Sequence, residues 1–225
     1  MRLGQRVRRR STLLLVSAIA AFALVDLAAA ENYKIQLTPA GQAAARATVL
    51  KKADFAPAPG WKGGLKKADL SDQGPLCPNF KPKESDLVIN GAAESDWLHP
   101  SGFAIVSLSA VLRTAGMVEL DWQRSVDAPT MLPCMSKVLV EQVGANARLV
   151  SARRVAFPRL ATLTDAFRIS VGFSNSKARM VIDLVFLGSG RTEMNLVFIA
   201  PQGAAADLHA AEIRLARILV SRIRA

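Results

Sequence analysis

Three segments in the second half of the chain, 163–173, 179–187 and 191–200, alternate apolar with other side chains at a period of two residues. This period is typical of β-strands. The connections between them are short and rich in Ser, Asn, Lys and Gly, whereas parallel neighbours would need a crossover of a dozen or more residues. The segments are therefore predicted to form an antiparallel meander. Any fold of this chain must cover that sheet.

The two turns of the meander determine which residues lie opposite one another. A two-residue turn at Asn175-Ser176 places Arg168 directly across from Asp183. The segment Gly188-Ser189-Gly190 is expected to be a three-residue turn, because that parity sets the apolar residues of the two strands against each other. The same register puts Asp183 across from Asn195.

Polar side chains on this sheet allow two interpretations. Arg168 and Asp183 can form a cross-strand ion pair with a purely structural role. Together with Glu193 and Asn195 they can instead form a polar patch in a cleft between the sheet and a layer of helices. Trp61 and Trp97, in predicted loops, are either core residues or stack on a ligand there. The candidate ligand cleft therefore comprises Trp61, Trp97, Arg168, Asp183 and Asn195.

The remaining pattern completes the fold class. Further strands are expected at 87–90, 103–112 and 148–157. Helices are expected at 39–52, at 115–126, around Cys134 and at 204–224, where Leu208, Ala211, Leu215, Ile218 and Leu219 form an apolar stripe. This order predicts an α+β fold, a mostly antiparallel sheet of about five to six strands covered by N-terminal, central and C-terminal helices in an α/β/α sandwich.

The N-terminal residues have the layout of an export signal. Five arginines lie within the first ten residues, an apolar run follows at 13–25, and Ala28-Ala29-Ala30 forms a small-residue cleavage site. We expect a signal peptide at 1–30, cleavage before Glu31, and a single α+β domain at 31–225 outside the cell or in the cell envelope. An uncleaved N-terminal anchor is the alternative. Both the general secretory and the twin-arginine routes are compatible with the sequence.

Export changes the charge balance. The chain has 29 basic and 18 acidic residues, and loss of 1–30 leaves 24 and 17, a net charge of +7 in place of +11. A basic surface outside the cell favours peripheral contact with anionic polymers or lipid head groups. Nucleic acid is not an expected partner. The expected partner is an envelope or extracellular ligand or protein.

Cys77 and Cys134 are the two cysteines of the chain. Because an isolated pair is normally oxidised outside the cytosol, we expect a disulfide between them. The bond would pin the predicted long loop at 62–85 to the central helices. His99 and His209 are far apart in the sequence and no metal-ligand spacing is present, so neither a metal nor another cofactor is expected.

Catalytic motifs are not found in the sequence. Nucleophilic hydrolysis needs a Ser or Cys with a His base, and no G-x-S-x-G elbow is present. The leading hypothesis is an exported, non-catalytic domain that binds a ligand or protein partner through the long loop and a sheet cleft. The alternatives are a cell-envelope structural protein that binds anionic polymers or lipids, and a hydrolase of unrecognised type.

The order of elements resembles a known fold family. A first helix, the segment Ala53-Asp54-Phe55 with Gly60-Trp61 shortly after it, the strands, the central helices and a closing helix resemble the PsbP-like α/β/α sandwich. In outline the chain is similar to exported bacterial PknH-like sensor domains. The resemblance implies a cleft rather than a catalytic set, and it assigns no binding residue in this chain.

Overall fold

A computed structural model describes residues 33–56, 58–70 and 77–223. The predicted signal peptide and cleavage site lie outside these residues. The strands of the described part are β1 (Lys34–Ile35), β2 (Lys62–Lys66), β3 (Val88–His99), β4 (Phe103–Leu112), β5 (Ala147–Arg154), β6 (Leu163–Phe173), β7 (Arg179–Ser189) and β8 (Thr192–Pro201). The helices are α2 (Pro39–Ala47), α3 (Ala115–Arg124), α4 (Met131–Val143) and α5 (Ala205–Ile223), with short 3-10 turns η1 (Lys52–Phe55) and η2 (Gln202–Ala204).

The described strands form one open sheet in the order β1-β3-β4-β8-β7-β6-β5, with β2 also paired to β3. Every pairing is antiparallel except that of β1 with β3. The predicted α+β class with a mostly antiparallel sheet is confirmed. The prediction of five to six strands was too low, because the described residues form a sheet of eight strands.

One of the additional strands, β2, lies in the segment predicted as a loop at 62–85. Its sequence, Lys-Gly-Gly-Leu-Lys, has little β-propensity and no alternation that would indicate a half-buried strand. It is a strand because it pairs antiparallel with residues 94–98 of β3, which continues well beyond the predicted end at 90. Backbone pairing with a long neighbour, which no local pattern records, determines this element.

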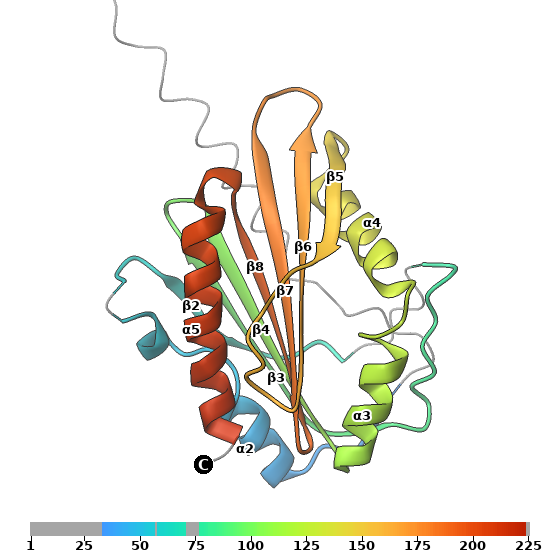
Figure 1. Cartoon of the computed structure of the whole chain (residues 1–225). Coiled ribbons are helices and arrows are strands. Elements are labelled where there is room, and N and C mark those ends of the chain that lie inside the picture. Colours follow the sequence, from blue (N-terminus) through green and yellow to red (C-terminus); the bar gives the residue numbers. More distant parts are fainter. Residues whose placement is uncertain (1–32, 57, 71–76, 224–225) are drawn as a thin grey trace, which may run out of the picture.

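Helices cover both faces of the sheet, α5 on one face and α3 with α4 on the other (Figure 1). On the α5 face, Val181 and Phe198 pack against Leu215. On the other face, Ile182 packs in the cluster that contains Trp122 and Leu139. Both sets of alternating side chains are therefore buried in the central strands.

The turn between β7 and β8 differs from the prediction. Ser189 pairs with Thr192, so the turn consists of the two residues Gly190 and Arg191, and Asp183 lies across from Phe198 rather than Asn195. Gly190 has a φ of +55°, in the left-handed region that favours glycine. The parity argument failed because both faces of β7 are buried, so apolar residues find apolar neighbours in either register. The predicted register of β6 and β7, with Arg168 across from Asp183, is confirmed.

The first helix is shorter than predicted. Thr38 caps it as expected, since its hydroxyl accepts a hydrogen bond from the Gly41 amide at 3.0 Å. The helix ends at Ala47, because the Thr48 hydroxyl lies 3.0 Å from the Ala44 carbonyl and 2.7 Å from the hydroxyl of Ser109 on β4. The chain then turns into η1 instead of continuing to 52.

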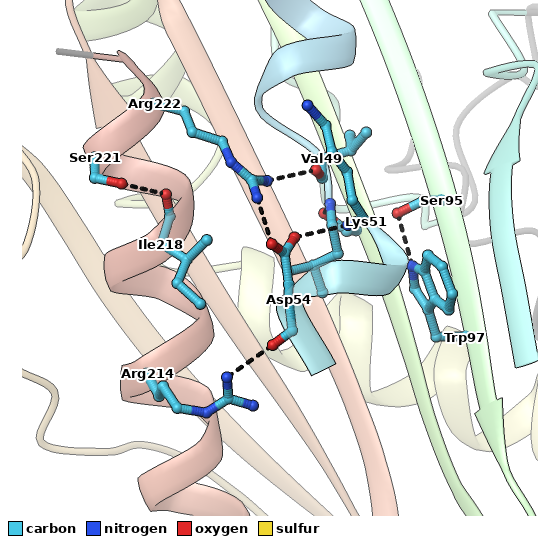
Figure 2. Close-up of polar contacts among 11 residues, drawn as sticks. Val49, Lys51, Asp54, Ser95, Trp97, Arg214, Ile218, Ser221 and Arg222 are labelled. Atoms are coloured by element: carbon cyan, nitrogen blue, oxygen red, sulfur yellow. Dashed lines mark hydrogen bonds and ion pairs between the residues drawn. The ribbon is translucent and has the colours of Figure 1, made fainter. Parts of the chain in front are cut away.

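A polar clamp joins η1 to the end of α5 (Figure 2). Asp54, which is only 6% exposed, accepts hydrogen bonds from the Lys51 amide and from the Arg222 guanidinium. Arg222 also donates to the carbonyl of Val49, and Arg214 donates to the carbonyl of Asp54 at 2.7 Å. These contacts hold two positions along α5 to the segment 49–54, and so fix the position of the helix on the sheet face that it covers.

The clamp gives a testable stability prediction. Asp54→Asn removes the charge and one acceptor, leaving either the Lys51 amide or Arg222 without its partner. We expect the free energy of unfolding to fall by about 1.5–3 kcal/mol, the usual loss for hydrogen bonds to charged groups. Urea unfolding checks this, with exposed Asp207→Asn as control. Equal stabilities for the two variants would contradict the role of the clamp.

Candidate functional site

The residues of the predicted ligand cleft do not meet in one place. Trp97, Asp183 and Arg168 lie on the same sheet face in one cross-strand row, with Ile105 and Phe198 between Trp97 and Asp183. Four strand spacings, roughly 19 Å, therefore separate the backbones of Trp97 and Arg168. Asn195 pairs with Phe186 and lies on the opposite face.

The tryptophans belong to an aromatic cluster beside η1. The ring of Trp61 stacks on Phe55 with centroids 4.7 Å apart, and Phe55 contacts Trp97 at 4.8 Å. Trp97 is only 3% exposed, and its indole N–H donates to the Ser95 hydroxyl at 3.1 Å (Figure 2). Trp97 is thus a core residue with its polar group satisfied, and only the partly exposed Trp61 presents ring surface to solvent.

Arg168 and Asp183 form the predicted ion pair. Nε and Nη2 of Arg168 donate to the two carboxylate oxygens of Asp183 at 2.7 and 2.5 Å. The side chain of Asp183 is 2% exposed, so a ligand has no direct access to its carboxylate. This geometry matches the structural interpretation of the pair.

Two α5 residues that were not among those predicted for the cleft, Glu212 and His209, adjoin this ion pair. Glu212 lies against Asp183, and burial first and the neighbouring Asp183 carboxylate second raise the pKa of Glu212 to about 9. Nδ1 of His209 lies 3.2 Å from Glu212 Oε2. A signal for Glu212 was present in the sequence, because it falls four residues after Leu208 and three before Leu215 on the apolar stripe of the helix.

A second buried acidic group lies on the other face, beneath α3. The Tyr33 hydroxyl donates to Asp121 at 2.9 Å, and the Ser125 hydroxyl donates to the other oxygen of Asp121 at 3.0 Å. Burial first and the charge of Asp121 second raise the pKa of Glu84 to about 9. The same two causes raise the pKa of Glu193 well above its ordinary value. The described structure therefore holds protonated carboxyl groups on both faces at neutral pH.

The accessible candidate site is a basic hollow at the end of the sheet formed by β5, β6 and β7. Arg148 and Arg179 each pair with Gly172, on either side of it, so the three residues form one cross-strand row with no side chain in the middle. A Cβ on Gly172 would lie 3.1 Å from Cγ2 of Val150 and 3.6 Å from Nε of Arg148, so the side chains of both residues extend over the glycine. The turn between β6 and β7 lies above this row, at the top of Figure 1.

The hollow has a volume of about 280 Å³ and is lined by Arg148, Gly172, Phe173, Ser176, Lys177, Ala178 and Arg179. Arg148, Lys177 and Arg179 are exposed, and within the described residues none of them forms an ion pair. By contrast, Arg154, which lies on β5 like Arg148, forms an ion pair with Asp165. The hollow is therefore a concentration of uncompensated positive charge beside the buried Gly172.

A bulge in β5 aligns a further arginine with the hollow. The register between β5 and β6 shifts between Leu149 and Ser151, where Val150 is the extra residue of β5. Because side chains alternate along a strand, Arg148 and Arg153 would point to opposite faces without the bulge. With it, Arg148 pairs with Gly172 and Arg153 with Arg168, both on the α5 face.

Comparison of the chain with family models, with curated proteins and with solved structures finds no match. The resemblance to PsbP-like domains thus stays a prediction. No helix in the described residues is long and apolar enough to cross a membrane. Within the same residues, His, Cys, Asp and Glu side chains form no group of three that could hold a metal ion.

Proposed function

We propose that this chain is an exported, non-catalytic domain that binds an anionic group of its partner in the basic hollow. The row Arg148–Gly172–Arg179 carries the proposal. Two arginines in one row, with backbones roughly 10 Å apart, repel each other when no acid lies between them. An anion bound in the hollow between the two guanidinium groups would relieve that repulsion and contact both of them.

The chemistry of the lining favours a carboxylate or phosphate. A guanidinium group presents parallel N–H donors that match two oxygens of either group. The Ser176 hydroxyl and Lys177 lie on the turn at the rim, where they can add a hydrogen bond and a further positive charge. The proposed site therefore lies at the accessible end of the sheet, and not at Trp61, Trp97 or the Arg168–Asp183 pair.

Binding of pyrophosphate tests the proposal. By isothermal calorimetry on the purified protein at low salt, we expect Arg148→Gln and Arg179→Gln each to weaken pyrophosphate binding at least about tenfold, as loss of one charge-assisted contact implies. Arg217→Gln, which removes the same charge from an exposed position on α5, is the matched control and should leave the dissociation constant nearly unchanged. Equal losses in all three variants would show attraction to net charge alone and would contradict a site at the hollow.

A further inference from the structure

The free edge of β5 is the second unusual feature at this end of the molecule. β5 is the last strand in the sheet order, and among the described residues it pairs with β6 alone. Its residues 148–151 are all exposed. Leu149 and Val150 are 48% and 41% exposed, which is unusual for large apolar side chains on a strand. An unpaired strand edge offers backbone donors and acceptors to another extended chain.

The charges of β5 decide what kind of chain can pair with it. A second copy of β5, paired antiparallel over its full length, would bring Arg148 of one copy opposite Arg153 of the other. Like charges directly opposite each other destabilise such a pair. An extended segment with acidic side chains would instead place a carboxylate opposite each arginine. Antiparallel pairing of two β5 strands over their full length is therefore disfavoured. An acidic strand, in contrast, is complementary in charge to the edge.

The two sides of β5 differ in a way that specifies the pattern of that segment. Arg148 and Arg153 lie on the α5 face, whereas Leu149 pairs with Val171 and lies on the opposite face. A strand added to β5 alternates its side chains between the same two faces. Acidic residues on the first face and apolar residues on the second would match Arg148, Arg153 and Leu149 together.

From these observations we propose that β5 binds an extended polypeptide segment of a partner protein with alternating acidic and apolar residues, which adds a ninth strand to the sheet. This inference rests on the proposed function, since Arg148 belongs to both the edge and the hollow. One acidic side chain of the segment then enters the basic hollow, while main-chain hydrogen bonds supply the rest of the contact. The partner is thus recognised through a pattern and not through net charge alone.

Two peptides of equal composition separate pattern from charge. The first is acetyl-Glu-Val-Glu-Val-Glu-Val-Glu-amide, and the second is acetyl-Glu-Glu-Val-Val-Val-Glu-Glu-amide. By fluorescence anisotropy with labelled peptides and the full purified protein, we expect the alternating peptide to bind at least tenfold more tightly. N-methylation of its valine amides, which blocks main-chain pairing and keeps the charge, should weaken binding by a similar factor. Equal binding of all three peptides would overturn docking at the edge.

Protein variants separate this inference from the proposed function. Leu149→Asn removes the apolar contact at the edge without changing the charge beside Arg148, so it should weaken binding of the alternating peptide at least tenfold and leave pyrophosphate binding nearly unchanged. Arg148→Gln should weaken both. Pyrophosphate binding without preference for the alternating peptide would overturn the inference and leave the proposed function standing. Self-association of the protein that Leu149→Asn abolishes would assign the edge to a second copy and would also overturn it.

Discussion

The free energy of unfolding is expected to fall as the pH rises from about 5 to about 9, by at least about 2 kcal/mol. Burial first, and the neighbouring aspartates second, raise the pKa values of Glu84 and Glu212 from 4.5 to about 9. Between these limits the folded protein keeps protons that the unfolded chain has lost. Stability from these groups is therefore complete below pH 4.5 and is lost as the pH rises through 9. Urea unfolding at pH 5, 7 and 9 measures this slope.

Glu212→Gln isolates one contribution to the slope. The amide retains the size of the side chain and does not titrate, so the variant should lose less stability between pH 5 and pH 9 than the parent protein. Glu119→Gln on the exposed side of α3 is the control and should leave the slope unchanged. Parent stability that increases between pH 5 and pH 8 would contradict the assignment of buried, protonated carboxyl groups.

The second large effect concerns the disulfide, whose prediction is confirmed. Cys77 and Cys134 are bonded across a sequence separation of 57 residues, and both are buried in the core on the α3 and α4 face. We expect Cys77→Ser and Cys134→Ser each to lower the free energy of unfolding by about 2–5 kcal/mol, because the bond restricts the unfolded chain and the serine hydroxyl enters an apolar cluster. Chemical unfolding of the oxidised parent and both variants provides the comparison.

Thiol labelling provides the control for that experiment. Without denaturant, the parent protein should not react with a thiol reagent. Each single variant, in contrast, retains one cysteine whose thiol has lost its disulfide partner. Limited proteolysis should cut the variants near Cys77 before the sheet, because α4 anchors Cys134 through its buried neighbours Val138 and Leu139. Two reactive thiols in the native parent protein would contradict the bond.

The meander was predictable because strands 163–173 and 179–187 alternate clearly and the turn at Asn175-Ser176 is short. That register already places Gly172 across from Arg179, one side of the basic hollow. The other side was not predictable. Arg148 reaches Gly172 through the pairing of β5, and the bulge at Val150 leaves no mark in a sequence that reads as an ordinary exposed strand.

Burial on both faces explains the error in the register of β7 and β8. In β7 and β8, alternation identifies strands but does not decide the register, so the predicted pairing of Asp183 with Asn195 was wrong. In helix α5, in contrast, the sequence contained a signal for a buried polar residue. Its apolar stripe contained Glu212, and a carboxyl group at a buried position indicates a proton or a partner.

The most direct test of the basic hollow is a titration of the isotopically labelled protein with pyrophosphate, followed through the backbone amide resonances. We expect saturable chemical-shift changes centred on Arg148, Gly172 and the amides of 176–179, and their loss in a variant that combines Arg148→Gln with Arg179→Gln. Shifts of equal size around Trp61, or around α5 at Arg217, would contradict a site at the hollow.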